Sequence, residues 1–165
     1  MIRILVFIAS STAAFFVLLL GSQLPDTVAS HFGLSGKADG SMSRDAFVAI
    51  MCVVTAATPS LVWWVQDWAT RHKKLSIPEA DYWLAAERIE TTREFINKHG
   101  ALLSVMLAVF LAYNFWLVSA ANIAASEPGA ARLNITLFLA GLAVFLALVA
   151  AWLAALLRRF RRGGA

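Results

Sequence analysis

The stretch ITLFLAGLAVFLALVAAWLAALL, residues Ile135–Leu157, contains no charged residue. A helix needs about 20 predominantly apolar residues to cross the roughly 30 Å hydrocarbon core of a bilayer. This stretch is therefore predicted to be a transmembrane helix. Residues 4–20, 46–65 and 101–121 meet the same requirement. Because backbone groups in lipid must satisfy their own hydrogen bonds, all four stretches are expected to be α-helices.

The composition of the whole chain agrees with this interpretation. Of the 165 residues, 60% are hydrophobic and only 15% are charged. Soluble domains have about 45–50% and about 25% respectively, and a soluble fold of this size has too little interior to hide the excess. The predicted fold class is all-α integral membrane, with one membrane domain over 1–165 that forms a four-transmembrane-helix bundle. The lipid bilayer is then its first partner.

Lysine and arginine are distributed unevenly between the segments that connect the spans. One precedes the first span, six lie between the second and third, and four follow the fourth, which makes eleven of the fourteen. Because basic loops stay in the cytoplasm, both termini and the segment 69–100 are predicted to be cytoplasmic, and residues 22–43 form an outer loop. The net charge of +4 thus follows from topology, and no nucleic-acid partner is expected.

The cytoplasmic segment 69–100 has the features of a surface helix. Ser76 and Glu79 fit a capping box, and Pro78 is tolerated in the first helical turn. Apolar side chains beyond this point fall on one helical face: Tyr82, Ala86, Ile89 and Ile96. An amphipathic helix in the membrane interface is predicted. It serves either as a structural connector or as a docking helix for a partner, and Gly100 is a weak point if the helix continues into the third span.

The outer loop is too long for a simple connection and is rich in glycine. Connections beyond about 12–15 residues are usually functional or disordered, and glycine permits positive φ. Three glycines, Gly33, Gly36 and Gly40, together with Val28 and Phe32 as apolar anchors, predict a folded, hairpin-like loop. Ser43 is predicted to cap the second span, with Asp45 in its first turn.

Polar residues inside the spans are few. Asn114 is predicted to hydrogen-bond a neighbouring helix, because an amide facing lipid is costly. Alanines at four-residue spacing in the fourth span predict close packing within the bundle or against a second copy: Ala143, Ala147, Ala151 and Ala155. No span carries an acidic or basic residue near its middle, which argues against an ion-coupled transporter. No catalytic pattern is present either, so no catalytic residue, cofactor or metal is assigned and a non-enzymatic protein is expected.

Two blocks of the chain resemble a known family. The stretch LPDTVASHFGLSGKADG from Leu24 to Gly40 resembles the pattern of a bacterial membrane family of unknown function, domain-of-unknown-function family 1648. The stretch IPEADYWLAAERIETTREF is similar to a second block seen in some members, and contributes a cytoplasmic motif of Tyr82, Trp83, Glu87 and Arg88. The resemblance implies the bacterial inner membrane and extends to SdpI-like proteins, which implies a role in immunity or signalling. No stretch resembles the C-terminal block of those proteins.

Two functional hypotheses remain open. In the first, the outer loop of a non-enzymatic membrane protein recognises or responds to a partner, either a second copy or a membrane or extracytoplasmic protein. The candidate contacts are His31, Phe32, Asp26, Asp39 and Gly36. In the second, His31 with Asp26 or Asp39 binds a ligand or metal or transfers a proton, with an enzymatic or transport-accessory role. A third reading makes His31 structural, through a hydrogen bond within the loop.

Overall fold

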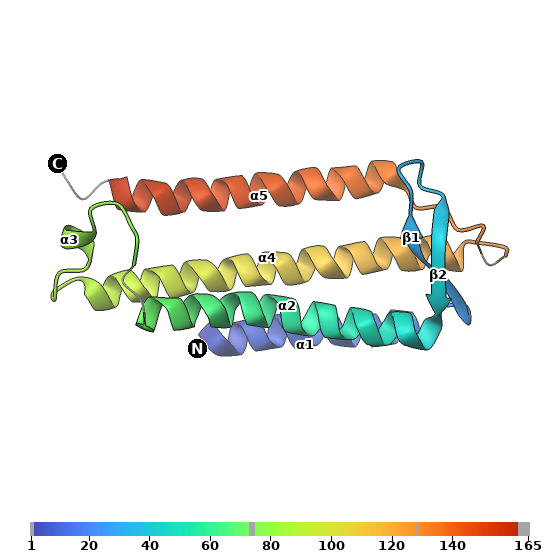
Figure 1. Cartoon of the computed structure of the whole chain (residues 1–165), viewed down its shortest axis with the longest axis horizontal. Helices are drawn as coiled ribbons and strands as arrows, with labels where there is room; N and C mark the ends of the chain where they lie inside the picture. Colours follow the sequence, from blue (N-terminus) through green and yellow to red (C-terminus); the bar gives the residue numbers. More distant parts are fainter. Residues whose placement is uncertain (1, 73–74, 128, 162–165) are drawn as a thin grey trace.

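The structure is a computed structural model that describes residues 2–72, 75–127 and 129–161. Its elements are α1 (Ile2–Gly21), β1 (Thr27–Phe32), β2 (Ala38–Ser43), α2 (Arg44–His72), α3 (Ala80–Trp83), α4 (Ile89–Ile123) and α5 (Ile135–Arg161). The four long helices run up and down in turn, and the strands lie across one end of them (Figure 1). We call this the hairpin end, and the opposite end, where α1 begins and α5 finishes, the terminal end.

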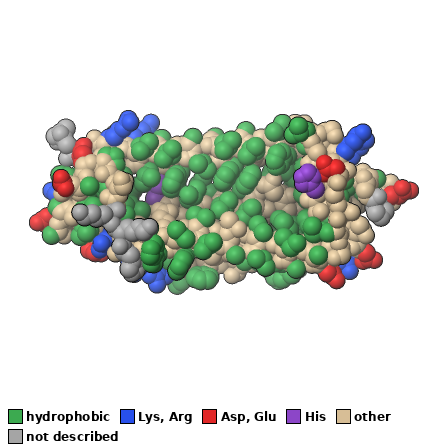
Figure 2. Space-filling view, in the orientation of Figure 1, with side chains coloured by type: hydrophobic (Ala, Val, Ile, Leu, Met, Phe, Trp, Pro, Cys, Tyr) green, Lys and Arg blue, Asp and Glu red, His purple; other side chains and the backbone are tan. Residues whose placement is uncertain are grey.

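As the sequence predicted, the structure has four helices that are long and apolar enough to cross a membrane. Hydrophobic side chains cover the middle of the visible face, whereas charged side chains gather at its two ends (Figure 2). This separation is what a bilayer requires, because a charge in the hydrocarbon is costly. Three residues used in the count of basic charges, Lys73, Lys74 and Arg162, lie outside the described residues.

Helices α1, α2 and α4 form a closely packed three-helix core. Near the hairpin end, Phe115 is fully buried and stacks on Phe47 at a centroid distance of 5.8 Å. Phe16 meets the Phe115 ring edge-on at 6.5 Å. Toward the terminal end, Val6 and Trp63 pack together with Ala101. Each helix of the core therefore contributes side chains to the packing at both ends of the bundle.

Helix α5 lies beside α4, away from α1 and α2 (Figure 1). The ring of Phe145 stacks on Phe110 at 4.3 Å. Nearer the terminal end, Trp152 donates its indole N–H to the His99 carbonyl at 2.9 Å. The four alanines at four-residue spacing are all exposed, so their predicted role in packing the bundle is wrong. Large side chains, not a smooth stripe, hold α5 to α4.

The predicted amphipathic helix of the segment 69–100 is not one helix. The short α3 ends at Trp83, and a turn separates it from α4, which begins at Ile89 and continues without a break through Gly100. The predicted capping box is also absent, because Glu79 precedes α3 in a left-handed conformation with φ 53° and makes no side-chain cap. Thr92 explains the turn, since its hydroxyl donates to the Trp83 carbonyl at 3.0 Å and folds α3 back over α4.

Gly100 is a contact point and not a break. A Cβ atom at this position would lie 2.2 Å from the Gln66 Oε1. The Gln66 amide uses this space to donate to the Ile96 carbonyl at 3.0 Å. The glycine therefore allows α2 and α4 to approach closely where the third predicted span begins.

Candidate functional site

The loop between α1 and α2 is a two-stranded antiparallel hairpin. Thr27 pairs with Ser43 and Val28 with Met42. The hairpin extends across the hairpin end from α2 toward α5 (Figure 1). At its base, the Ser43 hydroxyl accepts a hydrogen bond from the Ala46 amide at 3.4 Å, and Asp45 lies in the first turn of α2. The predicted start of the second helix is therefore confirmed.

The hairpin is anchored by its first strand and the residues before it. Leu24 and Val28 are buried in the aromatic cluster around Phe115. Phe32, the other predicted anchor, is only half-buried. Alternation along a regular strand would place Val28 and Phe32 on the same face. The register shifts between Ala29 and Phe32 interrupt that alternation, so Val28 carries the anchoring role.

Asn122, near the end of α4, clamps the hairpin to the bundle. Its Oδ1 accepts a hydrogen bond from the Ala29 amide at 2.7 Å, and its Nδ2 donates to the Ala29 carbonyl at 3.0 Å. Nδ2 also donates to the Val118 carbonyl at 2.9 Å. Asn122 is buried, so these bonds are shielded from water. One side-chain amide thus pairs with both backbone groups of Ala29, as a neighbouring strand would.

Sequence reasoning did not single out Asn122. Asn114, the amide selected from the sequence, donates to the Phe110 carbonyl at 2.7 Å within its own helix, and the described residues show no bond from it to a neighbouring helix. An amide in a helix can reach the carbonyl four residues earlier, and this satisfies it locally. The position of Asn122 in the sequence could have indicated its role. It lies in the last turn of an apolar helix, where a side-chain amide can reach the loops that leave the bundle.

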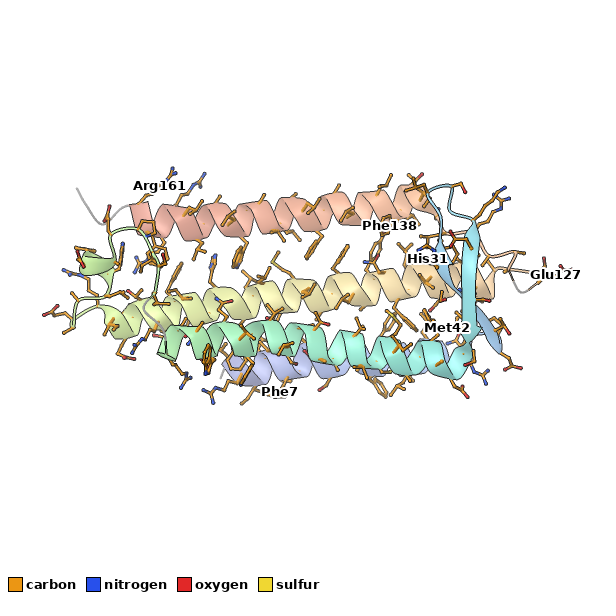
Figure 3. All side chains as sticks on the ribbon, viewed as in Figure 1. Phe7, His31, Met42, Glu127, Phe138 and Arg161 are labelled. Carbon is orange, nitrogen blue, oxygen red and sulfur yellow. The ribbon has the colours of Figure 1, made fainter. Side chains whose placement is uncertain are left out.

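His31 and Asp39 come together on the exposed side of the hairpin. His31 Nδ1 and Asp39 Oδ1 are hydrogen-bonded, and the two side chains are 75% and 50% exposed. His31 is labelled on the hairpin in Figure 3. The backbone opposite is Gly40, where a Cβ atom would lie 3.1 Å from the His31 Cβ. The hydrogen bond predicted for His31 within the loop, to either a backbone carbonyl or an aspartate, is therefore made to Asp39, and it leaves most of the imidazole open to solvent.

Asp26 does not join this pair. Its carboxylate lies 3.3 Å from the Arg44 guanidinium, which also donates to the Leu24 carbonyl at 3.2 Å. Asp26 is 95% exposed on its side chain, and such ion pairs contribute little stability. Arg44 closes the base of the hairpin, whereas His31 and Asp39 lie near its tip.

Gly36 makes the turn at the tip and docks it on the chain before α5. It has a φ of 76°, and its carbonyl accepts a hydrogen bond from the Leu133 amide at 2.8 Å. A Cβ atom at Gly36 would lie 2.5 Å from the Leu133 carbonyl oxygen. Gly33 and Gly40 have no positive φ, so only Gly36 needs glycine for the reason predicted. Leu34, beside it, is fully exposed.

The second predicted motif lies at the terminal end, far from His31. Trp83 is buried against Phe160 of α5, with ring centroids 5.5 Å apart. Arg88 lies over the Tyr82 ring at 4.0 Å. Glu87 is exposed. Trp83 therefore joins α3 to α5, and the structure gives this motif a packing role on the end of the bundle.

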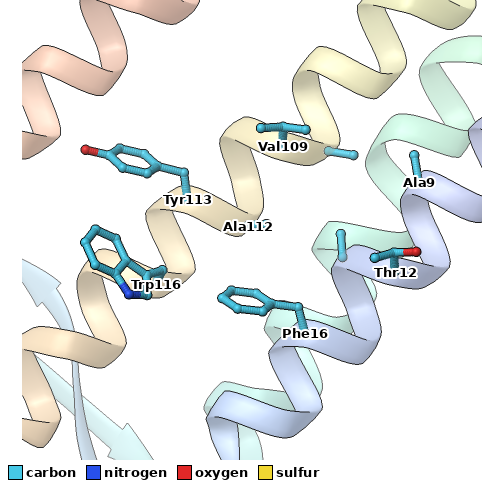
Figure 4. Close-up of a pocket in the computed structure, with 9 residues that line it drawn as sticks. Ala9, Thr12, Phe16, Val109, Ala112, Tyr113 and Trp116 are labelled. Carbon is cyan, nitrogen blue, oxygen red and sulfur yellow. The ribbon is translucent and has the colours of Figure 1, made fainter.

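The remaining features offer little chemistry near the hairpin. Within residues 2–72, 75–127 and 129–161 no three His, Cys, Asp or Glu side chains gather in a way that would hold a metal. A groove of about 520 Å³ between α1 and α4 is lined by aliphatic and aromatic side chains, among them Phe16, Val109 and Trp116 (Figure 4). Its hydroxyl groups come from Thr12 and Tyr113, and Tyr113 already donates to the Leu137 carbonyl at 2.6 Å.

Comparison with known protein families places part of the chain in a matched region. The model of a domain of unknown function (DUF1648) matches residues 7–57, which cover most of α1, the whole hairpin and the first half of α2. No curated protein and no solved structure matches the chain significantly. The matched region is the one that contains His31, Asp39 and Gly36, whereas Trp83 and its neighbours lie outside it.

Proposed function

We propose that the chain is a non-enzymatic, multi-pass protein of the bacterial inner membrane whose hairpin recognises a partner on the outer side. The observation that carries this proposal is the contrast between the two faces of the hairpin. One face is fixed by buried contacts of Val28 and Asn122, and the other presents His31 and Asp39 to solvent. A rigid exposed surface binds at a lower entropic cost than a mobile loop.

The uneven distribution of basic residues supports the orientation. Under the positive-inside rule it favours a topology with both termini and the turn around α3 in the cytoplasm. The partner is then either a membrane or extracytoplasmic protein, or a second copy of the chain. Resemblance to the SdpI-like proteins favours a role in immunity or signalling, with the hairpin as the sensing element.

Site-specific photo-crosslinking tests this function. A photoreactive residue at Ser41, which is exposed on β2, is expected to capture a defined protein in intact cells. Replacement of His31 and Asp39 by glutamine and asparagine should abolish the crosslink while the protein level stays constant. A photoreactive residue at Leu139, exposed on the apolar surface of α5, is the control. A crosslink that survives both substitutions would place recognition elsewhere.

The bonded His31 and Asp39 also support a second candidate, a ligand or metal site at the tip of the hairpin. A carboxylate bonded to Nδ1 orients an imidazole so that its Nε2 is available to a metal. Titration of the purified protein with Zn²⁺ tests this candidate. Binding of one ion that is lost in His31→Gln would favour it, and equal binding by both proteins would exclude it.

A further inference from the structure

We propose that the terminal end of the bundle carries a binding site for an anionic phospholipid, with the phosphate between Arg3 and Arg71. The acyl chains would lie along the exposed apolar surface of α1 and α2. This site is independent of the hairpin and of its proposed partner. Four observations carry the inference: an excess of positive charge, an unpartnered buried donor, two joined cavities, and their position along the helices.

The excess of positive charge arises because one aspartate forms ion pairs with two arginines. Asp67 is buried near the end of α2, with its side chain 11% exposed. Its carboxylate lies 3.5 Å from the Arg3 guanidinium and 3.0 Å from that of Arg71. Both arginine side chains are about half exposed, at 59% and 50%. Two cations on one anion leave a net charge of +1, and each guanidinium keeps donors for a second acceptor.

The neighbouring charges do not cancel this excess. Arg93 lies 3.2 Å from Glu90, and Lys98 lies 2.6 Å from Glu94, all on α4. In each of these two pairs the positive and the negative charge lie on the same helix and neutralise each other. An added anion should therefore bind most favourably at the guanidinium groups of Arg3 and Arg71. A guanidinium can donate two hydrogen bonds to two oxygens of one phosphate.

Trp63 adds an unpartnered donor at the same place. Its side chain is 7% exposed, and its indole Nε1 is buried with no hydrogen-bond acceptor among the described residues. The Arg3 guanidinium lies 5.7 Å from the centre of the indole ring. A buried donor without an acceptor costs free energy. Because Trp63 lines both cavities, an oxygen-rich headgroup that enters beside Arg3 would bring acceptors close to this indole ring.

Two cavities meet at these residues. One, of about 650 Å³, lies between the ends of α1, α2 and α4, and the other, of about 690 Å³, continues along α1 and α2. Arg3, Trp63, Asp67 and Arg71 line both. The second cavity then becomes apolar, with Phe7 of α1 (Figure 3) and Leu61 of α2 exposed along it. A polar compartment that opens into an apolar one matches the two parts of a phospholipid.

The position along the helices favours a lipid over a free anion. The site lies at the end of spans that can cross a membrane, and Trp64 and Trp68 line its apolar cavity. Tryptophan is enriched at the level of the lipid headgroups, and basic pockets between transmembrane helices bind anionic headgroups. A soluble phosphate compound would make no use of the apolar compartment.

Native mass spectrometry of the detergent-purified, full-length protein tests the proposal. Phosphatidylglycerol is titrated, with phosphatidylcholine of the same acyl chains as the neutral comparison and inorganic phosphate as the free anion. Phosphatidylglycerol should form a saturable one-to-one adduct that phosphatidylcholine does not form. The variant Arg3→Gln/Arg71→Gln should weaken this adduct about ten- to thirtyfold, from the loss of two charges near the headgroup. The control Arg158→Gln/Arg161→Gln removes two exposed charges of α5 at the same end and should leave it unchanged.

A second variant distinguishes binding of a lipid from binding of a free anion, and it leaves the ion pairs of the buried Asp67 intact. Ala57 is exposed and lines the apolar cavity, so Ala57→Trp should block the acyl chain without disturbing the core. It should weaken the phosphatidylglycerol adduct and leave phosphate binding as it was. The proposal is overturned if the two lipids bind equally, or if the Arg3→Gln/Arg71→Gln variant matches wild type. It is also overturned if inorganic phosphate competes for the site and Ala57→Trp has no effect.

Discussion

Asn122 and Ala29 are 93 positions apart in the chain, yet the side chain of one is bonded to both backbone groups of the other. The strand β1 therefore has a partner on each side: β2 through its backbone and α4 through a single amide. This contact makes the hairpin part of the bundle and not an appendage. It also connects the exposed His31 side of the hairpin to the helix that packs against every other long helix.

The first prediction concerns this clamp. Asn122→Leu leaves the Ala29 amide and carbonyl without partners, and each buried unsatisfied group costs about 1–3 kcal/mol. We expect a loss of about 2–4 kcal/mol in the free energy of unfolding. Asn114→Leu is the matched control: its bond is local, and the expected loss is about 1 kcal/mol or less. Equilibrium unfolding in detergent measures both, and equal losses would contradict the assignment of Asn122.

The second prediction compares two glycines that both have positive φ. Gly36 has a φ of 76° and Gly129 a φ of 86°. An alanine at either position pays about 1–2 kcal/mol for the left-handed conformation. At Gly36 the added methyl also meets the Leu133 carbonyl at 2.5 Å, whereas nothing lies within 4 Å at Gly129.

Gly36→Ala should therefore destabilise the protein more than Gly129→Ala and should release the tip of the hairpin from the chain before α5. Limited proteolysis near the tip is the direct measurement. Faster cleavage in Gly36→Ala than in Gly129→Ala is expected. Equal cleavage of the two variants would mean that the contact with Leu133 does not hold the tip.

The four long helices could be predicted from the sequence because hydropathy is a local property of the chain. Their lengths could not, since α2 and α4 extend beyond the apolar stretches into polar residues. The helix α4 continues through Gly100 because Gln66 fills the space that a side chain would need. That compensation comes from another helix, so no pattern around Gly100 reveals it.

Part of the candidate site could also be predicted. Glycines and polar residues in the loop indicated a folded hairpin, and a hydrogen bond of His31 within the loop was predicted, to a backbone carbonyl or an aspartate. The structure identifies Asp39 as the partner. Val28 is the main anchor of the hairpin, and Phe32 is not, because the register of β1 is irregular between them. The alternation of residues in the sequence does not reveal such an irregularity. Asn122 was missed because its partner lies at the other end of the sequence, and only the packed structure brings the two together.

A third prediction tests the orientation of the bundle. In a Cys52→Ser background, single cysteines at Ser41 and Ala130 should react with a membrane-impermeant reagent added from outside the inner membrane. A cysteine at Ser76 should react only after the membrane is permeabilised. All three positions are exposed, so differences in labelling report the side of the membrane. Reaction of Ser76→Cys alone in intact cells would reverse the proposed topology.

The last prediction separates the anchor of the hairpin from its exposed face. Val28 is completely buried, and Val28→Ala should reduce the free energy of unfolding by about 1–3 kcal/mol. The bond between His31 and Asp39 is largely exposed, so His31→Ala should cost less than about 1 kcal/mol. Phe32→Ala should fall between them, because that ring is half-buried.

The effects of these substitutions on capture of a partner should have the opposite order to their effects on stability. Under conditions where both variants are folded, His31→Ala should lose the crosslink at Ser41 and Val28→Ala should retain it. Thermal unfolding and crosslinking measured on the same preparations give the two readouts. A His31→Ala protein as unstable as Val28→Ala would make the imidazole part of the scaffold. The exposed bond to Asp39 would then be structural, and the recognition surface would have to lie on another part of the hairpin, with the exposed Leu34 at its tip as the next position to test.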